Sequence, residues 1–216
     1  MRALLLAIAA QMDKREAAAS FEFLVSLGVR LLIATTVRSG SVETPLSTAA
    51  KDIFERKITT AAELKQQLKT LTPSDPQFQE AFERARVSTA KLGRYYLRSL
   101  EMAAKGEAEP WFIPQDDRAI INLEHVLPEK PEENWPHITE DDVSQYAKRL
   151  GNLVLLRASD NSHLKSAGFA EKKQIYAKSP YVLTSQTAEL DDWTVSAIVE
   201  RQKQLAELAV RTWPGT

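Results

Sequence analysis

The first half of the chain has the hydrophobic spacing of amphipathic helices, with apolar residues recurring every three to four positions. This spacing predicts helices over residues 21–40, 45–58 and 60–71, and a further helical segment over 74–106 that is interrupted near Ser88. The third helix opens on Thr-Ala-Ala-Glu, the spacing of a capping box, in which both polar side chains satisfy free backbone donors. Residues 1 to about 110 are therefore expected to be helical.

The pattern changes in the second half of the chain. Residues 119–126 and 152–157 are short apolar runs, which are typical of strands. Between them, residues 128–139 contain three prolines and are expected to form a loop. Further helices are expected over residues 140–150, from Asn161 to Ser179 with a break at Gly168, and over residues 193–213.

These elements predict a mainly α fold. We expect a helical bundle over residues 1–112, followed by a region over 113–216 that holds the two strands and a long C-terminal helix. The length of 216 residues, with 44% hydrophobic and 26% charged residues, is that of a globular protein with a substantial core. The absence of cysteine excludes disulfides and thiolate metal sites and favours a reducing compartment, so we expect a cytoplasmic location.

The N-terminus is apolar from Ala3 to Ala10, but this run is short for a signal peptide, and polar residues follow it at once. It favours instead a domain excised from a longer protein, with its first helix packed on something upstream. No uninterrupted run of about 18 apolar residues is present, so no membrane span is expected.

Candidate chemistry lies where the strands end. Glu124 and His125 close the first apolar run before Leu127-Pro128, Asn152 opens the second, and Asn161 begins the next helix. Histidine suits a general base near neutral pH, and a carboxylate with an amide oxygen suits a magnesium ion that keeps several waters. Neighbours on a strand point to opposite faces, so Glu124 and His125 can serve one ion only if the strand bends at its end. Asn152 could orient His125 by bonding the intervening backbone.

Each of these residues also has an ordinary structural interpretation. An isolated Glu-His pair is usually a surface pair, Asn152 alone could open a strand, and Asn161 alone could cap a helix. His163 competes with Asn161 as a ligand, but two helical steps rotate about 200°, so the two side chains face nearly opposite ways and Asn161 is favoured. A distortion of the helix at Gly168 would restore His163 as a candidate. His137 is expected to be an exposed loop residue.

The ordered set of residues resembles a known nuclease motif. Residues 120–165 resemble the ββα-metal finger of HNH (His-Me finger) nucleases: an acid-His pair with an aliphatic residue and a proline, then an Asn-Leu-x-Leu strand, then an asparagine on the helix. Residues 120–213 resemble the C-terminal domain of GmrSD-type restriction endonucleases. The further matches are Leu150-Gly151-Asn152-Leu153, Asn161-Ser162, Phe169, Lys172, Tyr176, Trp193, Ile198, Arg201 and Trp213.

The resemblance implies a role for each site residue. It makes His125 the general base, Asn152 the orienting catalytic residue, and Glu124 and Asn161 the ligands of one divalent metal ion, Mg²⁺ first, with Mn²⁺ and Ni²⁺ as alternatives. Glu124 departs from the aspartate of many HNH enzymes, which puts the position of the ion in doubt. The resemblance also implies a DNA substrate and an N-terminal nucleotide-hydrolysing sensor domain or subunit that this chain, having no P-loop, does not contain.

Charge is unevenly distributed, although the net charge is only -1. Residues 149–178 hold six basic and two acidic residues, whereas the loop over 129–142 holds six acidic residues and one lysine. Lys165, Lys172 and Arg157 lie in the basic stretch and are the predicted DNA contacts. A second basic cluster, which is either a DNA-binding surface or a solvated helix face, consists of Arg84, Arg86, Lys91, Arg94 and Arg98.

The sequence thus predicts a metal-dependent DNA endonuclease, a nickase, from a modification-dependent or antiphage restriction system. The alternative is a non-catalytic helical module that binds DNA or protein and retains the finger as a structural element. Cleavage of RNA is a third hypothesis, because the sequence does not define the groove that accepts the strand.

Overall fold

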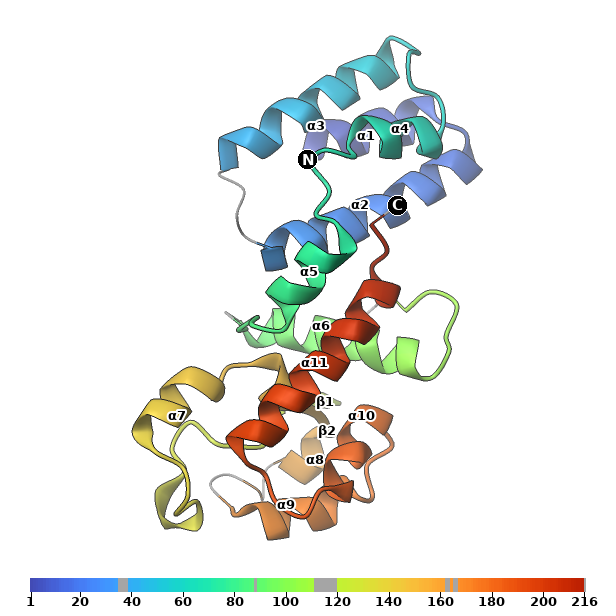
Figure 1. Cartoon of the computed structure of the whole chain (residues 1–216). Coiled ribbons are helices and arrows are strands. Elements are labelled where there is room, and N and C mark those ends of the chain that lie inside the picture. Colours follow the sequence, from blue (N-terminus) through green and yellow to red (C-terminus); the bar gives the residue numbers. More distant parts are fainter. Residues whose placement is uncertain (35–38, 88, 111–119, 162–163, 165–166, 216) are drawn as a thin grey trace. The chain divides into compact units, whose positions relative to one another are not determined.

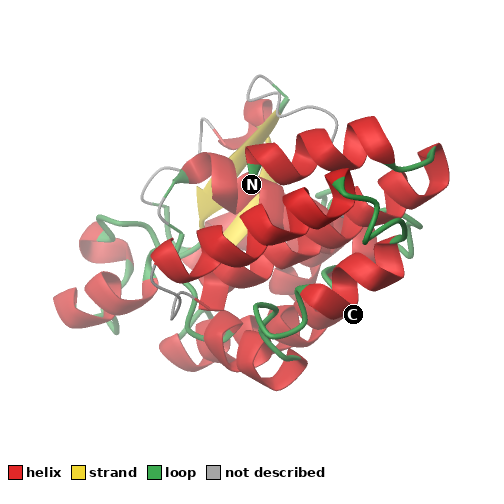
Figure 2. Cartoon of the chain, turned by 90° about the horizontal axis from the view of Figure 1, so that it is seen from above, coloured by secondary structure: helices red, strands yellow, loops and turns green. Residues whose placement is uncertain are grey.

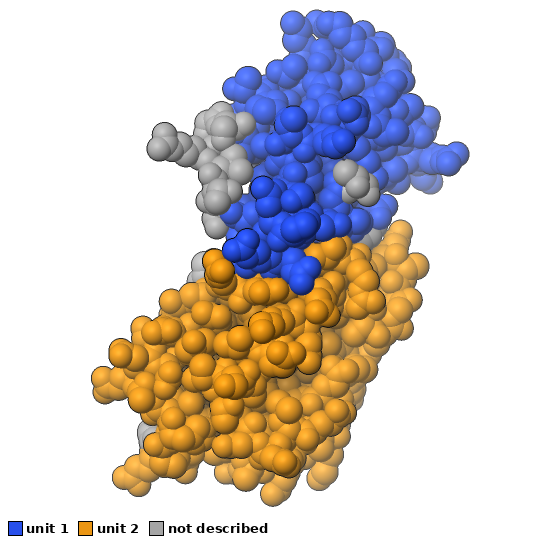
Figure 3. Space-filling model, in the orientation of Figure 1, with its two compact units in different colours: residues 1–81, 213–216 blue, residues 82–212 orange. Residues whose placement is uncertain are grey.

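The computed structural model describes residues 1–34, 39–87, 89–110, 120–161, 164 and 167–215. It is mainly helical, as predicted, and the sheet of the described residues has two strands (Figures 1 and 2). The chain forms two compact units, residues 1–81 with 213–216, and residues 82–212 (Figure 3). The boundary expected at residue 112 therefore lies inside the second unit, because the helix that follows Thr89 packs on the strands and on the last helix.

The first unit is a bundle of short and medium helices. Its elements are α1 (Arg2–Gln11), α2 (Lys14–Ala34), α3 (Ser39–Phe54), α4 (Ala61–Gln67) and most of α5 (Asp75–Phe82). The buried core includes Leu4, Ile8, Phe23, Leu27, Ile53 and Leu64. The capping box before α4 is confirmed: the Thr60 hydroxyl accepts a bond from Glu63 N, and the Glu63 carboxylate accepts one from Thr60 N.

A buried arginine ties the end of the chain to the first unit. The Arg30 side chain has no exposed surface, and its guanidinium donates to Trp213 O at 2.7 Å, Pro73 O at 2.8 Å and Asp75 Oδ1 at 2.6 Å. Because the charge is both paired and hydrogen-bonded, it can be buried in helix α2. By length and composition α2 is also the one described helix that could cross a membrane, with 44% of its apolar window buried in the folded chain.

The second unit contains the sheet. Its elements are α6 (Ala90–Ala104), β1 (Ile121–His125), the 3₁₀ helix η1 (Glu132–Asn134), α7 (Glu140–Tyr146), the 3₁₀ helix η2 (Leu150–Asn152), β2 (Leu153–Arg157), α8 (Ala158–Asn161), α9 (Phe169–Tyr176), α10 (Val182–Ser185), the 3₁₀ helix η3 (Gln186–Glu189) and α11 (Val195–Thr212). The core around the strands includes Val126, Leu127, Val154, Leu156, Phe169, Tyr176, Trp193 and Ile198.

The two strands are antiparallel, and their register fixes where the candidate chemistry lies. His125 is paired with Leu153, and Ile121 is paired with Arg157. The carboxyl end of β1 is therefore beside the start of β2, immediately after η2. The predicted break at Gly168 is confirmed, since Gly168 is the N-cap of α9.

Candidate active site at the end of strand β1

Glu124 and His125 are the last two residues of β1, and their side chains have different environments. Glu124 is buried, with 11% of its side chain exposed, whereas 32% of the His125 side chain is exposed. This difference is the alternation expected of neighbours on a strand. The imidazole Nε2 of His125 lies 4.0 Å from the Glu129 carboxylate, which in turn pairs with Lys148 at 3.5 Å. His125 is thus accessible at the edge of the sheet, whereas Glu124 is directed inward. Both residues stay in the regular ladder of β1, so their side chains keep the opposite orientations that the sequence predicts for a strand that does not bend.

Asn152 holds the chain that follows His125. Its buried side chain makes hydrogen bonds through both polar atoms: Oδ1 accepts from Leu127 N at 2.8 Å and Trp193 Nε1 at 2.9 Å. Its Nδ2 donates to Leu127 O at 2.8 Å and Ala147 O at 3.0 Å. Leu127 and Ala147 flank the loop between the strands, so Asn152 closes this loop at both ends, through the backbone bonds that the sequence predicted.

Helix α11 fixes the position of Asn152 by bonding the backbone on either side of it. Arg201 Nη1 donates to the carbonyl oxygens of Leu150, Gly151 and Leu153 at 3.2, 2.7 and 2.9 Å. The Gln202 side chain accepts a hydrogen bond from Gly151 N and donates one to Phe82 O. Arg201, which the sequence offered as a match to the family that it resembles, thus bonds backbone beside the site, and the contribution of Gln202 was not predicted.

Gly151 shows why the chain can approach α11 so closely. A Cβ atom at this position would collide with the Ile198 carbonyl oxygen and with the Gln202 side chain. A glycine immediately before the key asparagine is the sequence signal that could have indicated this contact, since glycine marks close approaches of backbone.

Lys172 is placed differently from its prediction as a DNA contact. Its side chain has no exposed surface, and its ammonium donates to Glu124 Oε1 at 2.6 Å and to His125 O at 2.7 Å. Helix α9 packs Lys172 and Tyr176, one turn apart, into the core beside β1. A buried ammonium that is committed to these two oxygens does not face DNA, so the predicted phosphate contact is corrected to an internal ion pair.

Burial shapes the electrostatics of this group of residues. It raises the pKa of the Glu124 carboxyl, against the opposite effect of the Lys172 ammonium. It also lowers the pKa of His125, and the positive charges of Lys172 and Lys148 act in the same direction while Glu129 opposes them. A lowered pKa leaves the imidazole neutral near pH 7, which is the state that a general base requires.

The other predicted DNA and metal residues are not brought together with His125 in what the structure describes. Arg157 is exposed at the far end of the two-stranded sheet, paired with Ile121. Asn161 is the last residue of α8, so the prediction that it begins a helix is wrong: the helix already starts at Ala158, directly after β2. The side chain of Asn161 lies outside the described part of the chain, as do His163 and Lys165. Their roles stay predictions.

The second basic cluster is divided by the fold. Helix α5 ends before Arg84 and α6 begins after it, so Arg84, Lys91 and Arg98 do not share one continuous helical face. Arg94 is buried, and Arg86 donates to a backbone carbonyl of α7 at 2.7 Å. The cluster therefore includes structural arginines and is not a single basic stripe.

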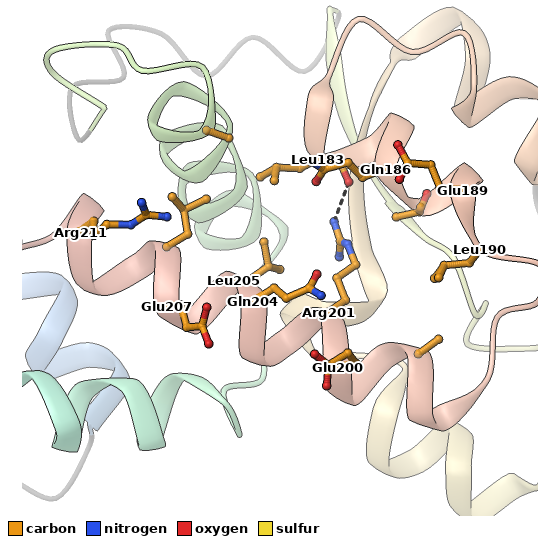
Figure 4. A pocket seen from close by; sticks show the side chains of 14 residues that line it. Leu183, Gln186, Glu189, Leu190, Glu200, Arg201, Gln204, Leu205, Glu207 and Arg211 are labelled. Atoms are coloured by element: carbon orange, nitrogen blue, oxygen red, sulfur yellow. Dashed lines mark hydrogen bonds between the residues drawn. The ribbon is translucent and has the colours of Figure 1, made fainter.

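A cavity of about 540 Å³ lies elsewhere in the second unit, between α11, α10, η3 and the end of α6 (Figure 4). Leu183, Leu190 and Leu205 contribute apolar surface, and Arg201 donates to Leu183 O at 3.3 Å on its inner side. Glu124, His125 and Asn152 do not line it. The cavity is therefore separate from the candidate site.

A comparison with protein families shows the family of this chain. Residues 72–208 match the family described as GmrSD restriction endonucleases, C-terminal domain. The chain belongs to this family. The match includes the whole of α6 and every element from β1 to α10, and so covers the candidate site of this GmrSD C-terminal domain. A comparison with curated proteins found no match.

The HNH resemblance implies that the site binds a metal ion, which requires suitable donor groups near Glu124 and His125. Among the residues that the structure describes, no group of three or more His, Cys, Asp or Glu side chains is placed so that it could hold a metal ion. The donor chemistry is still suitable, because Mg²⁺ is commonly held by one or two carboxylates and several waters. Glu124 supplies one buried carboxylate, of which Lys172 engages Oε1. A hydrated divalent ion at this site would have to share this carboxylate with Lys172.

Proposed function

We propose that this chain is a metal-dependent DNA endonuclease domain of a modification-dependent or antiphage restriction system. The observation that carries the proposal is the end of β1, where an accessible histidine of lowered pKa follows a buried carboxylate and the loop after it is closed by Asn152. The family match supports the coarser part, a domain of restriction endonucleases.

In this proposal His125 is the general base that takes a proton from the attacking water, since its imidazole is neutral and partly exposed. Asn152 holds Leu127 and with it the backbone next to His125. Glu124 and Asn161 are the proposed metal ligands, and the proposal requires the end of β1 to bend on metal binding so that Glu124 and His125 can serve one ion. A divalent ion, Mg²⁺ first, supplies the positive charge that stabilises the phosphate and the leaving oxygen. A single site of this kind cleaves one strand, so the product is a nick.

The charges around the site suit a polyanionic substrate only in part. Arg157 is exposed, and Lys165 stays a predicted phosphate contact, while Lys172 is excluded by its burial. Recognition of modified DNA is assigned to a separate nucleotide-hydrolysing sensor domain or subunit. We therefore expect the isolated chain to nick DNA weakly and with little sequence preference.

The test is relaxation of supercoiled plasmid with Mn²⁺ or Mg²⁺ by the wild type and by His125→Ala. His137→Ala is the matched control, because His137 carries a similarly exposed side chain, 40% against 32%, outside the site. The proposal predicts metal-dependent nicking that is lost in His125→Ala and kept in His137→Ala. Equal nicking by all three proteins would refute the role of His125.

The second candidate is a non-catalytic interaction module. It is favoured by the pairing of Glu124 with Lys172, which compensates the carboxylate without a metal ion. A titration separates the two functions: the nuclease binds Mn²⁺ in a manner that depends on Glu124, whereas the interaction module binds none.

A further inference from the structure

Lys172 links the two residues of the candidate site from a distant part of the chain. Its ammonium lies 2.6 Å from Glu124 Oε1 and 2.7 Å from the backbone oxygen of His125. One side chain therefore holds the proposed ligand by its carboxylate and the proposed base by its main chain. Its fully buried position on α9 leaves it little freedom to exchange these partners for solvent.

The carboxylate that Lys172 holds is also the proposed metal ligand. Lys172 engages Oε1, and the backbone of His125 also hydrogen-bonds this carboxyl, so an ion would have to share it through the second oxygen, Oε2. A divalent ion at that oxygen would lie within a few ångströms of the ammonium, and two positive charges at such a distance repel strongly when partly buried. Without any cation, however, a buried carboxylate is unstable, because its charge is removed from water.

These opposing effects define a role for the lysine. We propose that Lys172 is the internal counter-cation of the metal site: it stabilises Glu124 and positions His125 before an ion binds, and it weakens the binding of that ion by repulsion. The inference rests on the proposed function of Glu124 as a ligand. Lys172 is a positioning residue, since it acts through Glu124 and the backbone of His125.

The proposal makes a prediction that a purely structural lysine does not. In Lys172→Met the chain keeps a side chain of similar length but loses the cation, so the metal ion takes over the compensation of Glu124. We expect this variant to bind Mn²⁺ at least about tenfold more tightly than the wild type, while its nicking rate falls at least about tenfold because His125 is no longer held. Tighter metal binding with slower turnover is the signature.

Lys173→Met is the matched control. It is the next residue on α9, but its side chain is partly exposed and its ammonium donates to the backbone oxygen of Leu190, at 2.7 Å. We expect wild-type Mn²⁺ affinity and nicking for this variant. Lys172→Arg keeps the positive charge and is expected to bind Mn²⁺ no more tightly than the wild type.

Two measurements are made on the full chain: Mn²⁺ affinity, from the electron paramagnetic resonance signal of the free ion, and melting temperature in EDTA and in Mn²⁺. The proposal predicts that Mn²⁺ raises the melting temperature of Lys172→Met more than that of the wild type. It is overturned if Lys172→Met and the wild type have equal affinities and equal shifts. If Lys172→Met is unfolded in EDTA, folding on addition of Mn²⁺ supports the proposal.

A double variant separates a failure of the inference about Lys172 from a failure of the proposed function. If Lys172→Met stays unfolded with Mn²⁺ while Glu124→Gln/Lys172→Met folds, the ion cannot replace the lysine and the inference is overturned. If the proposed function itself is wrong, the result is different: the wild type and Glu124→Gln then bind Mn²⁺ equally weakly. When wild-type binding depends on Glu124 and Lys172→Met does not exceed it, only the inference fails.

Discussion

Asn152 makes the hydrogen bonds whose removal should have the clearest effect. Asn152→Ala deletes two bonds to Leu127, one to Ala147 O and one to Trp193 Nε1, all from a side chain with no exposed surface. The Leu127 amide and the Trp193 indole then become buried donors without these acceptors. We expect a large loss of stability and greater conformational freedom of the backbone next to His125.

The size of the expected loss in the free energy of unfolding follows from these four hydrogen bonds. Each hydrogen bond contributes about 1 kcal/mol net, and a buried donor left unsatisfied costs about 1–3 kcal/mol. Two such donors and two weakened carbonyl contacts give a loss of about 4 kcal/mol. Since domains of this kind are stable by about 5–15 kcal/mol, the variant should still fold under mild conditions but unfold at much lower denaturant concentration.

A second substitution tests whether hydrogen bonding is the cause. Asn152→Asp keeps the shape and the oxygen that accepts from Leu127 N and Trp193 Nε1, but it replaces the donor that faces two carbonyl oxygens. A charged acceptor in that position should destabilise the protein by at least as much as alanine.

The assay is urea denaturation followed by circular dichroism, with the free energy of unfolding compared at constant m-value. Asn122→Ala is the control, because Asn122 lies on β1 with a partly exposed side chain. It should change stability by less than about 0.5 kcal/mol. A loss below about 1 kcal/mol in Asn152→Ala, or a neutral Asn152→Asp, would refute the reasoning.

Three further outcomes are expected. Burial lowers the pKa of His125 below its ordinary value of 6.5, and a general base must be neutral. The kcat for nicking should therefore rise with pH through a midpoint below 6.5 and be flat above it. A midpoint above pH 7 would contradict this assignment. Gly151→Ala should lower the free energy of unfolding by more than about 2 kcal/mol, because its Cβ would collide with the Ile198 carbonyl and the Gln202 side chain; a change under 0.5 kcal/mol by urea titration would show that α11 can move away. Arg201→Met removes the donor shared by three backbone carbonyls and should lower the melting temperature by roughly 6–12 °C, about 3 kcal/mol, in a thermal scan; an unchanged value would mean that these carbonyls find other donors.

Some features of the fold could be predicted because they depend on neighbours in the chain. The Thr60–Glu63 capping box, the helix start after Gly168 and the two strands on either side of the loop need only local spacing and turn chemistry. That the strands pair antiparallel was not predicted and comes from the structure. The position of Asn152 immediately before the second strand also brings it close to the loop backbone, which it bonds at Leu127 and Ala147. Local geometry decides these features, so a single sequence contains them.

Other features require the packing of segments that are distant in sequence. Lys172 was expected to bind phosphate, as exposed lysines do, because nothing in the sequence indicates that α9 turns it inward onto Glu124. Likewise, the spacing of Arg84, Lys91 and Arg98 suggests one helical face only while the helix is continuous, and the chain breaks between α5 and α6. The sequence by itself determined the mainly α architecture and the adjacency of Glu124 and His125. Only the tertiary structure decided which charges are buried, because desolvation depends on what packs around a side chain and not on its neighbours along the chain.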